Sequence, residues 1–310
     1  MSHPLLIYHP EAPLYGEILR KKIPDLDLCM ASRPEEAAEF IEKAEILLTW
    51  KIPDELLRKA YNLKWFASLG AGNEHLLRNP LIPPTIPFTK VTVYGEMMAE
   101  YVFAYLLSFI RETEKYREDQ KKKRWDPQRP GRLRGRVLGL LGLGSVGREI
   151  AKRGKQFGMT VIGVKRHPGP VENVDQVFPP DGLKKMLPMV DYLVNALPLT
   201  PETDRLLGEK ELRLLREGTV LFNVGRGRTI DERALIQVLR ERKIRAVLDV
   251  FEEEPLPPAS ELWTLDNVTV TPHVSGINLP EEICEEFVAN YGRWVRGEQL
   301  VGLVDREKGY

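Results

Sequence analysis

Short apolar stretches alternate with amphipathic stretches along the first ninety residues. Three segments have the apolar spacing of helices, namely 12–22, 33–44 and 53–61. Four stretches have the apolar character of buried strands, namely 5–9, 25–31, 45–50 and 63–70. Strands that alternate with helices predict βαβ units and a parallel sheet. Four prolines between Pro80 and Lys90 exclude a helix there and predict a rigid connector.

The pattern then starts again after a long polar-ended segment. Residues 95–123 predict one continuous helix, apolar at first and charged later, and residues 124–135 interrupt it. A second alternating series follows, with apolar strands predicted at 136–144, 159–165, 191–198, 219–225, 245–250 and 267–272. The fold class is therefore α/β with two domains, and we expect the last helix, 279–297, to return to the first domain.

Composition narrows the partners that this chain can be expected to have. The 310 residues carry 45 basic and 45 acidic side chains, so charge gives no reason to expect nucleic acid or an anionic membrane. No apolar run reaches 18 residues, and the first residues lack the pattern of a signal peptide. We predict a cytoplasmic protein with Cys29 and Cys284 reduced.

A glycine-rich turn opens the second series. Gly142, Gly144 and Gly147 follow an apolar strand and precede a helix, which is the context that a G-x-G-x-x-G motif needs. The first glycine permits a tight turn, the second lets backbone approach a pyrophosphate, and the third lets the helix pack closely. The helix N-terminus would then present N–H groups to the phosphates. This pattern predicts a dinucleotide-binding turn.

The end of the next strand indicates which dinucleotide is bound. An acid about 20 residues beyond the turn would hold the ribose hydroxyls of NAD, but Lys165 and Arg166 occupy this place. Two cations suit the 2′-phosphate of NADP, through charge-assisted hydrogen bonds. We therefore predict NADP as the preferred cofactor and NAD as the alternative. The alternative is that both cations face water and bind no cofactor group.

Three later strands end in residues with catalytic potential. Arg226 stands between two glycines after one strand, Asp249 and Glu254 follow the next strand, and His273 follows the last. Ligands of open parallel sheets bind at the carboxyl edge, where these residues would converge. No cysteine and histidine cluster has metal-ligand spacing, so we expect no metal.

The motifs of the second series, taken in order, resemble those of the D-isomer-specific 2-hydroxyacid dehydrogenases. The stretches GLLGLGSVGREIAKRGKQFGM, NALPLTPETDRLLG, LFNVGRGRTIDERAL, LDVFEEEPLP and VTPHVSG carry the resemblance, and SLGAGNEHLL resembles the substrate loop of the family. The pattern is most similar to the glyoxylate/hydroxypyruvate reductase-like branch. The resemblance implies a Rossmann-type doubly wound sheet at 97–277 and a smaller flavodoxin-like substrate domain at 1–96 and 278–310.

The resemblance also implies roles for individual residues. Arg226 would hold the substrate carboxylate, His273 would be the general acid, and Glu254 would orient the imidazole and favour its charged form. Backbone N–H groups of Ala71 and Gly72 would form a second grip, completed when the domains close. Asp249 would face the nicotinamide carboxamide.

The expected contacts extend beyond these groups. The substrate contacts implied are Leu69, Ala71, Gly72, Arg226 and His273. The cofactor contacts implied are Gly142, Leu143, Gly144, Ser145, Val146, Gly147, Lys165, Arg166, Leu197, Pro198, Thr203, Val224, Gly225, Asp249, His273, Ser275 and Gly276. The substrate would be a small 2-oxo acid, in a pocket lined by the adaptable side chains of Met97 and Met98 and bordered by Trp263. The long helix and the arm after it resemble dimerisation elements, so a homodimer is expected.

Several alternatives stay open at this point. An NAD-dependent D-2-hydroxyacid or phosphoglycerate-type dehydrogenase would share most of these motifs. Formate dehydrogenases typically carry Gln where this chain has Glu254. A dinucleotide-sensing corepressor-like regulator could keep the same three catalytic residues without the same function.

Overall fold

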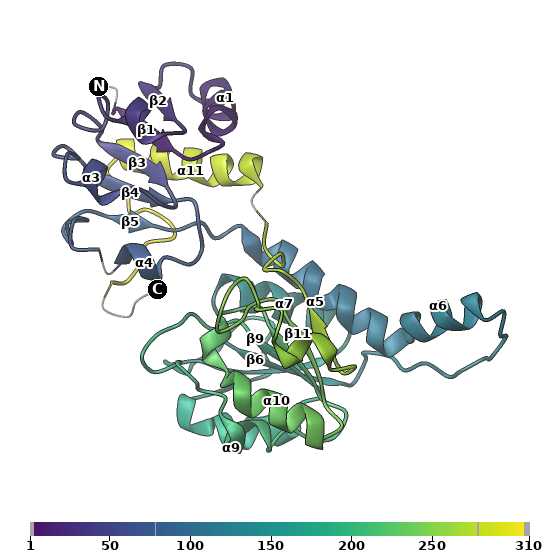
Figure 1. Cartoon of the computed structure of the whole chain (residues 1–310). Coiled ribbons are helices and arrows are strands. Elements are labelled where there is room, and N and C mark those ends of the chain that lie inside the picture. The colour runs from purple at the N-terminus through teal and green to yellow at the C-terminus, as the bar shows by residue number, and fades with distance from the viewer. Residues whose placement is uncertain (1–2, 78, 278, 307–310) are drawn as a thin grey trace. The chain divides into compact units, whose positions relative to one another are not determined.

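The computed structural model describes residues 3–77, 79–277 and 279–306, which divide into two compact units (Figure 1). Unit 1 comprises the chain up to Val93 together with the segment after residue 277, and unit 2 runs from Tyr94 to Ile277. The division therefore falls before the expected residue 97. The reason is that helix α5 (Tyr94–Arg111) already begins at Tyr94, and its Gly95 packs against Glu149 of unit 2.

Unit 1 is built on a parallel sheet of five strands. Their order is β2-β1-β3-β4-β5, which is the flavodoxin-like order. The strands are β1 (Leu5–Tyr8), β2 (Leu28–Ala31), β3 (Ile46–Thr49), β4 (Trp65–Ser68) and β5 (Phe88–Thr89). The helices are α1 (Ala12–Lys22), α2 (Pro34–Ala37), α3 (Asp54–Leu57), α4 (Glu74–Leu77) and α11 (Pro280–Val295). Helices α1 and α11 pack against each other, so the last helix is part of this unit.

Unit 2 contains a parallel sheet of seven strands in the order β12-β11-β10-β9-β6-β7-β8. The chain passes from β8 back across the sheet to β9, so the order reverses beside β6, as in Rossmann-type folds. The strands are β6 (Val137–Leu141), β7 (Thr160–Val164), β8 (Gln176–Phe178), β9 (Tyr192–Asn195), β10 (Val220–Asn223), β11 (Arg245–Leu248) and β12 (Val268–Val270).

Helices cover both faces of this second sheet (Figure 1). Leu138 and Leu140 of β6 contribute to the apolar core beneath α5 and α7 (Ser145–Gln156). Leu141 points to the opposite core, to which α9 (Glu209–Leu212) and α10 (Glu232–Glu241) contribute. Successive side chains of a strand point to opposite faces, so near-continuous apolar strands are what a sheet buried on both sides requires.

Local structure differs from the sequence-based expectation in several places. The helix expected over 53–61 is helical only in α3. The helix expected over 95–123 is broken, because Glu112 adopts a left-handed φ of 54° between α5 and α6 (Thr113–Lys121). The helix expected over 33–44 is helical only in α2, and turns follow it. The proline-rich connector contains β5, and a further short strand, β8, was not expected. These two strands have only two and three residues, too few for a periodic signal.

Candidate active site

The glycine turn joins β6 to α7 at the carboxyl edge of the unit 2 sheet. Gly142 has a φ of +93°, and a Cβ there would lie 3.0 Å from the carbonyl oxygen of Ala196. A Cβ on Gly147 would lie 2.0 Å from the carbonyl oxygen of Gly142, so helix and turn could not pack this closely with a side chain. Both positions need glycine for reasons internal to the fold.

Gly144 has a different reason to be glycine. A Cβ at this exposed position would meet no protein atom within 4 Å, and its φ of −77° is open to any residue. Gly144 caps α7 without a side-chain hydrogen bond, and Ser145 and Val146 begin the first turn, where N–H groups lack intrahelical partners. Because Gly144 has no side chain, a pyrophosphate could come close to the N–H groups of the first helical turn.

The remaining residues expected at the cofactor lie around this turn. Leu143 is buried against Gly163, Lys165 and Arg166 directly follow β7, and Arg166 Nη2 lies 3.1 Å from Glu202 Oε2. Leu197, Pro198 and Thr203 follow β9, the neighbour of β6 at the point where the strand order reverses. Thr203 fixes this loop, because its hydroxyl donates to the Pro198 carbonyl at 2.6 Å and accepts from the Thr200 N–H at 2.8 Å.

Arg226 follows β10 and is held by its backbone. A Cβ on Gly225 would lie 2.5 Å from the Leu197 carbonyl oxygen, and one on Gly227 would lie 1.9 Å from that of Phe251. The two glycines therefore let the Arg226 segment pass between neighbouring loops. The Arg226 carbonyl accepts hydrogen bonds from Thr229 Oγ1 at 2.5 Å and from Asn223 Nδ2 at 3.2 Å. The side chain donates from Nη1 to the Gly225 carbonyl at 2.8 Å.

Behind Arg226 lies a buried amide network. Asn195 Nδ2 donates to Asn223 Oδ1 at 2.9 Å and to Thr229 Oγ1 at 2.6 Å. Asn195, Asn223 and Thr229 are each at most 2% exposed, so the cost of burying their polar atoms is offset by these bonds and by those to neighbouring backbone groups. Val224, another expected cofactor contact, donates its N–H to the Asn195 carbonyl at 3.0 Å. The network ties the ends of β9 and β10 together under the arginine.

His273 and Glu254 form a hydrogen-bonded pair. The His273 Nδ1 to Glu254 Oε2 distance is 2.7 Å, and Glu254 Oε1 accepts from the Phe251 N–H at 3.0 Å. The carboxylate is thus fixed at one oxygen while it orients the imidazole with the other. The His273 side chain is 51% exposed, so its opposite ring nitrogen, Nε2, is left for a reacting group. Neighbouring strands β11 and β12 supply the pair, which the family resemblance implied.

Asp249 anchors the loop that carries His273. This fully buried carboxylate accepts from Thr271 Oγ1 at 2.6 Å, from the Val274 N–H at 2.8 Å and from the Ser275 N–H at 2.9 Å. The Asp249 carbonyl accepts the His273 N–H at 2.9 Å. His273 itself has a φ of +54°, a left-handed conformation that a histidine keeps only when its surroundings fix it.

Tyr101 of α5 extends this anchor. Its hydroxyl lies 2.6 Å from Thr271 Oγ1, and burial, followed by the negative charge of Asp249, raises the pKa of the Tyr101 phenol. Tyr101 therefore stays a neutral phenol at neutral pH. Gly276, the last cofactor contact expected, packs against Met98 of the same helix, and Ser275 beside it is buried.

The expected substrate loop lies in unit 1, after β4. Leu69 is buried, Ala71 is exposed, and Trp50 Nε1 donates to the Gly72 carbonyl at 3.3 Å. Asn73 Nδ2 donates to the Gly70 carbonyl at 3.1 Å, which closes the loop. Across the described parts of the chain, the N–H groups of Ala71 and Gly72 donate to no protein acceptor. They are therefore available as hydrogen-bond donors for a ligand.

Sequence reasoning missed the residues that hold these groups in place. Asn195, Asn223 and Thr271 lie inside the quoted motifs and Tyr101 lies on the long helix, but sequence reasoning assigned a role to none of them. A weak signal was present, because an asparagine ends each of the apolar strands LVN and LFN, where a buried polar group needs a partner. The identity of that partner depends on strand order, which the local sequence does not contain.

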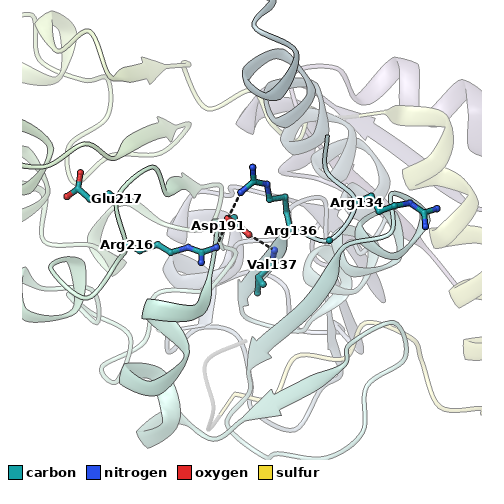
Figure 2. Close-up of a pocket in the computed structure, with 7 residues that line it drawn as sticks. Arg134, Arg136, Val137, Asp191, Arg216 and Glu217 are labelled. Atoms are coloured by element: carbon teal, nitrogen blue, oxygen red, sulfur yellow. Dashed lines mark hydrogen bonds and ion pairs between the residues drawn. The ribbon is translucent and has the colours of Figure 1, made fainter. Parts of the chain in front are cut away.

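A hollow of about 540 Å³ lies at the opposite, amino-terminal edge of the unit 2 sheet. Figure 2 shows Asp191 between Arg136 and Arg216. Asp191 Oδ2 accepts a hydrogen bond of 2.7 Å from the Val137 N–H. Asp191 Oδ1 also lies 3.2 Å from Arg136 Nη1. These contacts join the beginnings of β6, β9 and β10, so Asp191 serves the sheet and not the catalytic edge.

Replacing Asp191 is expected to weaken the fold without changing catalysis. Asp191→Asn should lower the free energy of unfolding by about 2 kcal/mol, since a mostly buried carboxylate loses its charge-assisted bonds. Urea denaturation measures the loss, and steady-state kinetics should be unchanged below the transition. Glu217→Gln, at a more exposed carboxylate of the same hollow, is the control and should cost much less. A fall in kcat/KM with unchanged stability would contradict this role.

The described residues also bear on metal binding and membrane insertion. Within residues 3–77, 79–277 and 279–306, no three His, Cys, Asp or Glu side chains group closely enough to hold a metal ion. No helix in those ranges is both long and apolar enough to cross a bilayer.

Both Cys29 and Cys284 are free thiols. Cys284 is buried, which raises the pKa of its thiol to about 12.

The dinucleotide turn and the histidine pair at one sheet edge define the class as an NAD(P)-dependent oxidoreductase. More narrowly, the chain belongs to the D-isomer-specific 2-hydroxyacid dehydrogenase family. Its residues 103–275 match the family model described as D-isomer specific 2-hydroxyacid dehydrogenase, NAD binding domain. The family and the α/β fold class predicted from the motifs are confirmed.

Individual relatives place the chain within this family. It is 31% identical to the glyoxylate/hydroxypyruvate reductase A of Yersinia enterocolitica, over 99% of both chains. A D-isomer specific 2-hydroxyacid dehydrogenase from Xanthobacter autotrophicus, solved with NADPH and MES, is 34% identical with a TM-score of 0.92, and 100% of both chains is covered. An NADPH-dependent glyoxylate/hydroxypyruvate reductase from Sinorhizobium meliloti, solved with NADP and sulfate, is 27% identical with a TM-score of 0.88, again over 100% of both chains.

These relatives confirm the predicted glyoxylate/hydroxypyruvate reductase-like branch. The protein is a D-2-hydroxyacid dehydrogenase or 2-oxo acid reductase that uses NAD(P).

Proposed function

We propose that this enzyme reduces a small 2-oxo acid to the D-2-hydroxy acid with NADPH. The observation that carries the proposal is the His273–Glu254 pair, with Nδ1 and Oε2 2.7 Å apart, at the same sheet edge as Arg226 and the glycine turn. A histidine fixed on one nitrogen and exposed on the other suits a proton donor to a carbonyl oxygen. The relatives named as reductases support the same chemistry.

The residues divide the reaction between them. When bound, the nicotinamide supplies the hydride that goes to C2 of the substrate. His273 donates the proton from Nε2 to the former carbonyl oxygen, so that the products are a hydroxyl group and a neutral imidazole. Glu254 keeps Nδ1 protonated and the ring oriented, while Arg226 offers its planar fork to the substrate carboxylate. Asp249 remains our proposal for a contact with the nicotinamide carboxamide.

We infer a small substrate such as glyoxylate or hydroxypyruvate, with some tolerance for apolar 2-oxo acids. The named reductases among the relatives support the first part. Met98 packs against Gly276, and Met97 Sδ accepts the Ile277 N–H at 3.2 Å, so flexible side chains lie next to the last expected cofactor contact. The N–H groups of Ala71 and Gly72 are our proposal for further contacts with the substrate carboxylate.

The preference for NADPH rests on Lys165 and Arg166, which follow β7 where an acid would hold the ribose of NAD. Relatives solved with NADPH or NADP support it. Lys165→Asp should shift the ratio of kcat/KM values toward NADH by about tenfold or more, because a 2′-phosphate would then face a carboxylate. An exposed control, Lys184→Asp, carries the same charge change on α8 (Leu183–Met186) and should leave the ratio unaltered.

The proposal as a whole is tested by assaying NADH and NADPH against glyoxylate, hydroxypyruvate, pyruvate and phenylpyruvate. We expect the highest kcat/KM with NADPH and either glyoxylate or hydroxypyruvate. A higher efficiency with NADH, or strict selectivity for a long or phosphorylated acid, would contradict it. A homodimer, measurable by light scattering, and a cytoplasmic location remain predictions.

A further inference from the structure

An ion pair crosses the adenosine side of the expected cofactor site. Arg166 directly follows β7, whereas Glu202 lies in the loop that follows β9, and β6 with its glycine turn lies between these two strands. Arg166 Nη2 is 3.1 Å from Glu202 Oε2. The carboxylate therefore reaches past the dinucleotide turn to a guanidinium that is our proposed ligand for the 2′-phosphate.

Hydrogen bonds within its own loop favour the charged form of Glu202. The Thr200 hydroxyl and the Glu202 N–H donate to its carboxylate, and these bonds, with the charge of Arg166, keep the pKa of Glu202 below its ordinary value. The loop itself is fixed by the Thr203 contacts with Thr200 and Pro198. Glu202 is thus an anion at neutral pH, and its side chain, 66% exposed, has room to move.

This arrangement sets two anions against each other. A 2′-phosphate and the Glu202 carboxylate both need the donors of Arg166, and they repel each other when both are close. NADPH can bind only if Glu202 gives up or shares Arg166. NADH has no phosphate there, so its binding does not require the ion pair to open.

We propose that Glu202 is a specificity-determining residue that competes with the cofactor 2′-phosphate for Arg166 and so limits the preference for NADPH. The inference rests on the proposed function, in which Arg166 receives that phosphate. Three side chains from two loops would then set the preference between NADPH and NADH. Lys165 and Arg166 favour NADPH, and Glu202 opposes them.

The test is the variant Glu202→Gln, which keeps the size of the side chain and its hydrogen bond with Thr200 but removes the charge. Fluorescence titration of the purified full chain should show the Kd of NADPH falling about threefold to fivefold, the upper part of the range for releasing one exposed ion pair. The Kd of NADH should change by less than about twofold. The gain should shrink at high ionic strength, because salt screens exposed charges.

Two further variants separate the ways in which this inference can fail. Glu172→Gln removes an exposed acid from the connection that carries Arg166 and should leave both Kd values unchanged. Arg166→Ala should weaken NADPH binding, and adding Glu202→Gln to it should bring no further gain. If Arg166→Ala weakens NADPH binding but Glu202→Gln has no effect, the competition is wrong and the cofactor assignment stands. If Arg166→Ala leaves the NADPH to NADH ratio unchanged, both are wrong.

Discussion

His273→Gln is expected to lower kcat for 2-oxo acid reduction by about 10³-fold, within the 10² to 10⁴ range of general acid catalysis. Glutamine can hydrogen-bond to the carbonyl oxygen but cannot give up a proton at neutral pH. The hydride would then have to be transferred without simultaneous proton donation. The dissociation constants of NADPH and NADH should change little, because the imidazole acts on the substrate side of the reaction.

The contacts of His273 explain why the loss should be confined to turnover. Glu254 already engages Nδ1 of His273, so Nε2 is the nitrogen through which the histidine can act. The loop is held by backbone bonds to Asp249, which do not depend on the imidazole, so the substitution should leave the fold intact. The loss should therefore appear in turnover and not in stability.

Stopped-flow measurement of NADPH oxidation, with cofactor titrations by fluorescence, tests this expectation. His9→Gln is the matched control, since His9 lies in unit 1, where its imidazole accepts from the Glu11 N–H and contacts the Tyr15 ring. It should retain full activity. Near-normal turnover of His273→Gln, or an equal loss in both variants, would remove His273 from the proposed role.

The sequence predicts the groups that carry the chemistry better than the groups that hold them. Gly142, Gly147, Arg226 and His273 belong to local motifs, since each motif is fixed by one strand end and the turn that follows it. The pairing of Glu254 with His273 was implied by the family resemblance, and the structure gives its physical basis, because the parallel neighbours β11 and β12 bring their carboxyl ends to one edge.

The supporting contacts depend on long-range geometry that periodicity does not contain. Asn195 meets Thr229 across 34 residues of sequence, and Tyr101 meets Thr271 across 170. The break at Glu112 escaped prediction for another reason, because a charged helical pattern runs through it and only the backbone conformation reveals it. The Arg166–Glu202 pair likewise joins two loops whose proximity depends on the order of the strands.

Arg226→Lys is expected to lower kcat/KM for the 2-oxo acid by about 10²- to 10³-fold, although the positive charge is kept. A guanidinium offers two parallel N–H donors to a carboxylate, whereas an ammonium is a point charge without this fork. Loss of one or two charge-assisted bonds, at about 1.5 to 3 kcal/mol each, accounts for a change of this size. Arg226→Gln should lose more, because it also removes the charge.

The backbone around Arg226 should not change when its side chain is replaced. Gly225 and Gly227 fit against neighbouring backbone, and the Arg226 carbonyl is held by Asn223 and Thr229, so the main chain should keep its path when the side chain changes. Arg228→Lys is the matched control two residues further along. Arg228 pairs with Asp204 at a half-exposed position, and its replacement should change kcat/KM by less than about threefold.

Steady-state kinetics with glyoxylate, together with NADPH binding and thermal unfolding of the same samples, separates a lost substrate contact from a disturbed fold. Lys and Gln at position 226 should raise KM and lower kcat while the Kd of NADPH and the unfolding temperature stay near those of the parent protein. Added guanidinium should restore part of the activity of Arg226→Ala, since it supplies the missing fork to the substrate carboxylate. If Arg226→Lys behaves like Arg228→Lys, the arginine does not hold the substrate, and the carboxylate must bind to other donors.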